Sequence, residues 1–182
     1  MEEIEIPTEH LHETINENAE EKMEQKKERW TLLVALSTAV MAVLAAIAGL
    51  LGGHHVNEAM IDQIRASDQW AFYQAKSIKT EIAASADRIL LAIPNSTAAP
   101  ENKDAMARYD KEKEEIKSKA EEFEKSSEVH LTKHVALSKA VTIFQIAIAL
   151  SAIAILTRKK MLWMGAMLLT LGGIWFLIMG II

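Results

Sequence analysis

The chain has 182 residues, of which 50% are hydrophobic and 25% are charged, and its formal net charge is −5. The absence of cysteine excludes disulfide bonds, thiolate catalysis and metal sites built from thiolates. A negative net charge gives no basic field for nucleic acid, so we expect no nucleic-acid partner. The mean hydropathy of +0.07 is that of an ordinary soluble domain, but it averages over three long windows that are almost free of charge.

Residues 1–30 form an acidic N-terminal arm. Met1 to Arg29 contain ten acidic and four basic residues. Thr8 is a suitable cap for a helix that begins at Glu9. A thin apolar stripe follows at a spacing of four, through Leu11, Ile15, Ala19 and Met23. This stripe is too narrow to fold alone, so the arm is either an extension of the next window, which we favour, or a docking strip for another protein.

Three windows are long enough to cross a bilayer. Residues 31–53, 135–157 and 161–182 contain a single charge, Lys139. Because about 20 apolar residues span the hydrocarbon core as a helix, we predict an all-α membrane protein with three transmembrane helices and a lipid bilayer as its surroundings. Small residues recur on one face of the first window and predict a helix-packing ridge there: Ala35, Ala39, Ala42, Ala46, Gly49 and Gly53. The second window repeats the small-residue spacing at Ala136 with Ala140 and at Ala147 with Ser151.

Basic residues near the ends of these windows predict the orientation. Lys22, Lys26, Lys27 and Arg29 precede the first window, and residues 158–160 connect the second and third. Since lysine and arginine favour the cytoplasmic side, we expect a cytoplasmic N-terminus, with residues 54–134 and the C-terminus on the outer side.

Residues 54–134 read as two helices with a tip at 94–101. Pro94 and Pro100 bracket the tip, and the periodicity on either side is helical. The spacing of three and four residues predicts a coiled-coil-like antiparallel hairpin. The predicted seam of its first helix is His54, Asn57, Ile61, Ile64, Asp68, Ala71, Ala75, Ile78, Ile82, Ser85, Ile89 and Ala92. The predicted seam of its second helix is Met106, Tyr109, Lys113, Ile116, Ala120, Phe123, Ser127, His130, His134 and Leu137.

The first helix carries a second apolar stripe, which includes Trp70, Tyr73 and Ser77 and lies off the seam formed by Asp68, Ala71, Ala75 and Ile78. A helix with two apolar stripes implies more than one neighbour. We therefore expect hairpins to associate into a homo-oligomeric scaffold, with Trp70 and Tyr73 as anchors between subunits. A carboxylate at seam position 68 needs a partner, which we expect near Lys125 to Ser127 of the second helix.

The histidines are the main candidates for chemistry. The antiparallel arrangement brings His54 and His55 opposite His130 and His134, which share one helix face as two metal ligands would, and Asp62 supplies a further oxygen. The alternative is that they are interfacial residues at wet ends of the seam, which we favour. No nucleophile with a base, phosphate loop or nucleotide motif is recognisable, so we expect no enzymatic activity and no cofactor. A metal-binding or catalytic membrane protein, and a pore along the oligomer axis, remain the competing hypotheses.

The segment Ala66 to Lys79, ASDQWAFYQAKSIK, together with Asn57-Glu58-Ala59, resembles the signature of a bacterial family of small membrane proteins, domain-of-unknown-function family 4337. The similarity extends from about Trp30 through the last window. The resemblance implies a bacterial inner membrane location. It implies no activity and no catalytic residues.

Overall fold

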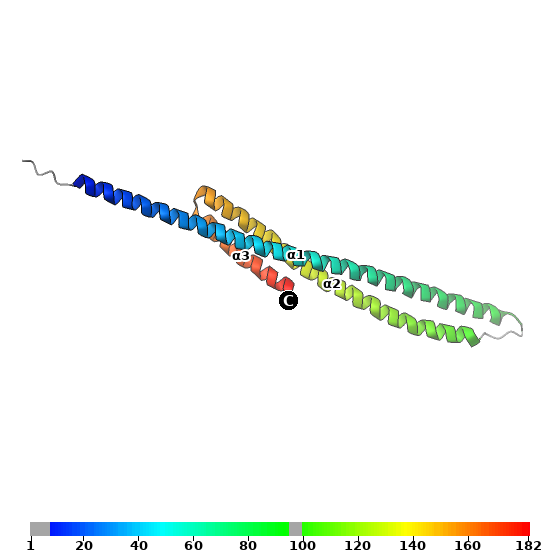
Figure 1. The fold of residues 1–182 in the computed structure, drawn as a ribbon. Helices are drawn as coiled ribbons and strands as arrows, with labels where there is room; N and C mark the ends of the chain where they lie inside the picture. Colours follow the sequence, from blue (N-terminus) through cyan, green and yellow to red (C-terminus); the bar gives the residue numbers. More distant parts are fainter. Residues whose placement is uncertain (1–7, 95–99) are drawn as a thin grey trace, which may run out of the picture. The chain divides into compact units, whose positions relative to one another are not determined.

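The computed structural model describes residues 8–94 and 100–182, with side chains from residue 22 onward except at 25 and 100–103. Apart from short connections, the chain in these ranges is helical, with α1 (Thr8–Ala92), α2 (Pro100–Thr157) and α3 (Lys160–Ile181) (Figure 1). α1 begins at the predicted capping threonine, and neither Gly52 nor Gly53 interrupts it. The acidic arm is therefore a helical extension of the first apolar window.

Contacts divide the chain into two compact units. The first unit comprises Met1–Gly49 and Lys139–Ile178, and the second comprises Leu50–Ser138 and Met179–Ile182. Each of the three helices contains a stretch long and apolar enough to cross a membrane. The three predicted windows therefore correspond to three helices of suitable length and composition.

The first unit buries side chains from all three helices. Met41 of α1, Ala147 of α2 and Ala166 of α3 form its buried cluster. Ala140 and Ser151, one turn or more along α2 on either side of Ala147, are also fully buried. The small-residue spacing predicted for the second window is therefore a packing face, because small side chains let helix backbones approach closely.

The ridge predicted for the first window lies elsewhere. Its alanines are exposed, at Ala35, Ala39, Ala42 and Ala46. α1 instead buries Val34, Met41 and Ala48, which are at most 1% exposed. The ridge is therefore not the face of α1 that is buried within this chain, and its role in packing between helices stays a prediction.

α3 approaches α2 closely at a glycine. A Cβ atom built on Gly173 would lie 2.7 Å from Cε1 of Phe144, whose side chain is fully buried. Trp163 of α3 also donates a hydrogen bond from Nε1 to Oγ of Ser37 in α1, at 3.1 Å. Packing and a polar contact therefore both hold α3 in the first unit.

α2 and α3 are joined by Arg158 and Lys159 alone. The N–H of Arg158 donates to the carbonyl of Ile155 at 3.4 Å, and its φ of 56° lies in the left-handed region. A residue with a Cβ pays about 1–2 kcal/mol there, which glycine does not. The turn therefore carries a basic side chain at a strained position.

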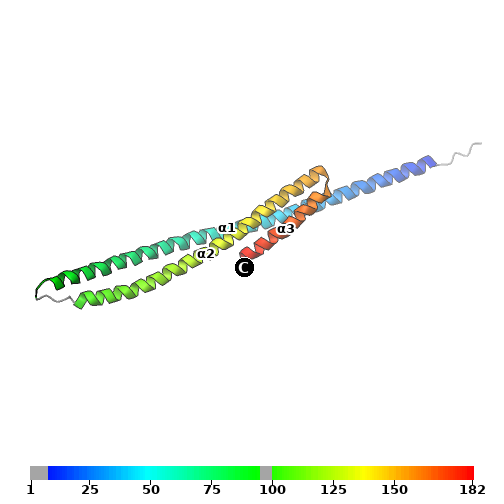
Figure 2. The same cartoon turned by 180° about the vertical axis from the view of Figure 1, so that it is seen from behind.

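In the second unit, α1 and α2 lie side by side (Figures 1 and 2). Ser127 of α2 contacts Ala59 of α1, and further along α1 Lys76 pairs with Glu112. Residue numbers thus rise along one helix as they fall along the other. α2 continues without interruption from this segment into the first unit, as the absence of internal proline and glycine predicts.

Candidate functional site

A buried carboxylate joins the two helices of the second unit. Asp62 is 6% exposed. Its carboxylate accepts hydrogen bonds from Oγ of Ser126 at 2.6 Å and from Nη1 of Arg65 at 3.2 Å. Ser127 donates to the carbonyl of Ala59 at 2.9 Å. Because a buried charge is stable only with such partners, these bonds fix the register of α1 against α2.

Aromatic and charged side chains continue this contact along α1. Nε1 of Trp70 donates to Glu124 at 2.8 Å, and the rings of Trp70 and Tyr73 meet edge to face with centroids 5.6 Å apart. Lys76 forms an ion pair with Glu112. The hydrogen bond from Lys76 lowers the pKa of the Glu112 carboxyl. The aromatic pair is therefore engaged with a neighbouring helix of the same chain.

The two faces of α1 are reversed relative to the sequence-based assignment. Trp70, Tyr73 and Ser77, expected to point outward, are half-buried, and Ala59 and Ala66 on the same side are buried. Every residue of the predicted α1 seam is exposed. We call the central part of that stripe the isoleucine face; it comprises Ile61, Ile64, Asp68, Ala71, Ala75, Ile78, Ile82, Ser85 and Ile89.

The reversal has a simple cause. Both stripes of α1 follow the spacing of three and four residues, so periodicity alone cannot choose between them. Ala59 and Ala66 on one helix and Ala120 on the other, all 5% exposed or less, allow a close approach that isoleucines would prevent. For α2 the predicted seam is confirmed, because all its residues are buried or half-buried.

The isoleucine face is a large apolar surface that no described part of the second unit covers. Its isoleucines have exposed fractions from 40% at Ile61 to 65% at Ile89. A shallow groove runs along it and is lined by Ser77, Ile78, Glu81, Ile82, Ser85, Ala86 and Ile89. Asp68 is exposed here, and Ser126, in the segment where its partner was expected, donates to Asp62 instead. Sequence analysis missed Asp62 as the register-fixing carboxylate, although Asp62 falls in the same spacing as Ala59 and Ala66.

The structure brings together only two of the four candidate metal ligands. Nδ1 of His55 lies 2.9 Å from Nδ1 of His130, so one ring donates and the other accepts. Nδ1 of His134 donates to the carbonyl of Gly52 at 2.8 Å, and His54 is exposed. Burial and the neighbouring His130 lower the pKa of His55. Within the residues whose side chains are described, no group of three or more His, Asp or Glu is placed to hold a metal ion.

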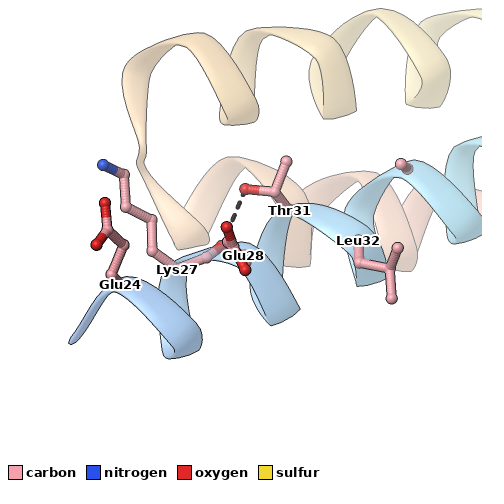
Figure 3. Close-up of a pocket in the computed structure, with 6 residues that line it drawn as sticks. Glu24, Lys27, Glu28, Thr31 and Leu32 are labelled. Carbon is pink, nitrogen blue, oxygen red and sulfur yellow. Dashed lines mark hydrogen bonds between the residues drawn. The ribbon is translucent and has the colours of Figure 1, made fainter. Parts of the chain in front are cut away.

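A surface pocket on α1 in the first unit has a mixed lining (Figure 3). Glu24, Lys27 and Glu28 contribute charges of both signs, and Leu32 contributes an apolar wall. The hydroxyl of Thr31 donates to the carbonyl of Lys27 at 3.0 Å, which is the dashed line in Figure 3. Charges of both signs along one helix are typical of a solvated surface, and no ligand chemistry follows from them.

These features define a class: an all-helical protein with three helices able to cross a membrane and an exposed, regularly spaced apolar face. The chain belongs to the family described as Domain of unknown function (DUF4337), whose model matches residues 30–182. The resemblance noted in the sequence is thereby confirmed. No curated protein and no solved structure matches the chain.

Proposed function

We propose that the protein is a non-enzymatic membrane scaffold that self-associates through the isoleucine face of α1. The observation that carries this proposal is the exposure of a stripe spaced by three and four residues over more than four heptads. That spacing fits a neighbouring helix in a left-handed coiled coil. A contiguous apolar stripe of this length is unusual on a monomer and marks an interaction surface.

The proposal includes a placement in the bacterial inner membrane. Residues 31–53, 135–157 and 161–182 span the bilayer, and the N-terminus is cytoplasmic. The paired segments of α1 and α2, residues 54–134, form an antiparallel hairpin on the outer side. Support comes from the three apolar helices and from the basic residues that flank them on one side.

A second copy of this chain is the partner that suits the face. Copies in one bilayer present the same face at the same height and in the same direction, so they pair in parallel. Ala71 and Ala75 at the centre allow close approach, while isoleucines lie on both sides of them. Isoleucine at both core positions of the heptad favours three or more strands over two.

The anchors of this assembly differ from those first expected. Trp70 and Tyr73 lie half-buried on the side of α1 that faces α2. Asp68, Ala71, Ala75 and Ile78 are exposed and form the centre of the proposed interface.

Cysteine crosslinking tests the proposal directly, because the chain contains no cysteine of its own. Ala75→Cys places a thiol on the isoleucine face, and Gln63→Cys is the matched control, exposed but off that face. In membranes under mild oxidation, Ala75→Cys is expected to form a disulfide between copies and Gln63→Cys is not. Crosslinking of neither variant, together with a monomeric mass in mild detergent, would contradict self-association.

A further inference from the structure

The first unit contains a basic cavity between α1 and the connection that joins α2 to α3. Its volume is about 280 Å³, and it is lined by Met23, Lys26, Lys27, Trp30, Arg158 and Lys160. Four of these six side chains carry a positive charge, and none carries a negative charge. In the part of the chain with described side chains, none of the four cations takes part in an ion pair.

We propose that this cavity binds the phosphate of an anionic ligand. Two sources can supply that chemistry: the headgroup of an anionic phospholipid or free phosphate. The lipid is the expected source, because α1 enters its apolar window at Thr31, directly after Trp30. Basic pockets beside membrane helices bind anionic headgroups by this chemistry. The inference rests on the proposed placement in a bilayer and is independent of self-association.

The charge of the cavity sets it apart from the neighbouring surface pocket. That pocket combines Lys27 with Glu24 and Glu28, whereas no carboxylate among the described side chains lines the basic cavity. An anion in the cavity therefore meets four positive side chains. Since the guanidinium of Arg158 can donate two parallel hydrogen bonds to a phosphate, it supplies geometry as well as charge.

The backbone at Arg158 gives a second argument. Its φ of 56° would cost glycine nothing, yet the position holds a long basic side chain that lines the cavity. The residue with the strained backbone is therefore the one that places a guanidinium at the cavity. A role for that guanidinium in binding an anion accounts for both features.

Trp30 provides a third observation. Its Nε1 is buried and has no hydrogen-bond acceptor among the described residues. An unsatisfied buried donor is unfavourable. Tryptophan is also favoured where apolar and polar surroundings meet, with its ring in one and its N–H in the other. Trp30 therefore places an amphipathic ring beside the cavity, at the start of the apolar window.

The test uses the full chain purified in a neutral detergent. Native mass spectrometry measures the retention of phosphatidylglycerol against zwitterionic phosphatidylcholine. The variant Lys27→Gln with Arg158→Gln removes two cations from the cavity, and Lys79→Gln with Lys119→Gln is the matched control on exposed lysines of the second unit. We expect the cavity variant to lose about thirtyfold in affinity for phosphatidylglycerol and the control to lose none.

A competition arm with inorganic phosphate distinguishes the two sources. If the ligand is a lipid, phosphatidylglycerol stays bound under excess phosphate. If phosphate displaces the lipid from the unmodified protein, and binding of phosphate is lost in the cavity variant, the anion site is supported and its ligand is free phosphate. Equal retention of both lipids, or equal losses in the cavity and control variants, would overturn the proposal. If circular dichroism shows that the cavity variant is misfolded, the variant Lys26→Gln with Lys160→Gln, at two other exposed lining residues, takes its place. It should weaken the retention of phosphatidylglycerol by a similar factor, and equal retention in this variant and the control would overturn the proposal.

Discussion

The reversal of the α1 faces predicts opposite outcomes for two alanines five residues apart. Ala66 is 0% exposed between α1 and α2, whereas Ala71 is exposed on the isoleucine face. Ala66→Leu forces three additional carbon atoms into a filled interface, which costs about 1–3 kcal/mol. Ala71→Leu adds the same atoms where nothing in the second unit opposes them. Leucine and alanine are both good helix formers, so propensity does not confound the comparison.

Urea titration of the full chain in mild detergent, followed by far-ultraviolet circular dichroism, measures the effect. With a slope of about 1 kcal/mol/M for a segment of this size, the unfolding midpoint of Ala66→Leu should fall by about 1–3 M. The midpoint of Ala71→Leu should stay near that of the unmodified protein when both are measured at a protein concentration low enough to keep the chain monomeric. A loss for Ala71→Leu with none for Ala66→Leu would show that α2 packs on the isoleucine face, which refutes the arrangement described above.

Three further substitutions test individual contacts. Asp62→Ala should lower the free energy of unfolding by about 1–3 kcal/mol in the same titration, because two donors lose their buried acceptor. Asp68→Ala should leave the unfolding midpoint unchanged and raise the oligomer fraction measured by light scattering. Gly173→Ala should lower the thermal midpoint, since its Cβ would overlap an aromatic ring, while Gly165→Ala, which meets nothing within 4 Å, should not. Because the pKa of His55 is lowered, the unfolded chain binds the proton more readily, so stability should be full above the ordinary value of 6.5 and decline below it. His55→Gln should flatten that decline in thermal melts recorded across this pH range; an unchanged slope would contradict the assignment.

The positions of the helices could be predicted because they depend on local sequence signals. Thr8 marks the start of α1, Pro94 and Pro100 bracket the break before α2, and the basic residues 158–160 interrupt the last two apolar windows. Each of these signals acts within a few residues, through a cap, a missing N–H or a gap in hydropathy. No knowledge of the partner helix is needed to read them.

The choice of packing face could not be predicted in the same way. α1 has two stripes with one period, and the decision between them depends on the volume of side chains on another helix. The sequence shows alanines at positions 59 and 66, but their role in close packing depends on Ala120 of the facing helix α2. In α2 the other faces are strongly charged, so periodicity and polarity agreed and the seam was identified. Asp62 lies on the same face as Ala59 and Ala66, so its contact with α2 was missed because that face was not chosen.

Asp68 is the one charged residue of the isoleucine face. Parallel copies joined through this face would bring their Asp68 carboxylates together, and like charges at a core position oppose association. The isoleucines on either side supply apolar area that favours association. The strength of the proposed assembly therefore reflects a balance between the Asp68 carboxylates, which repel one another, and the isoleucines around them, whose burial favours association.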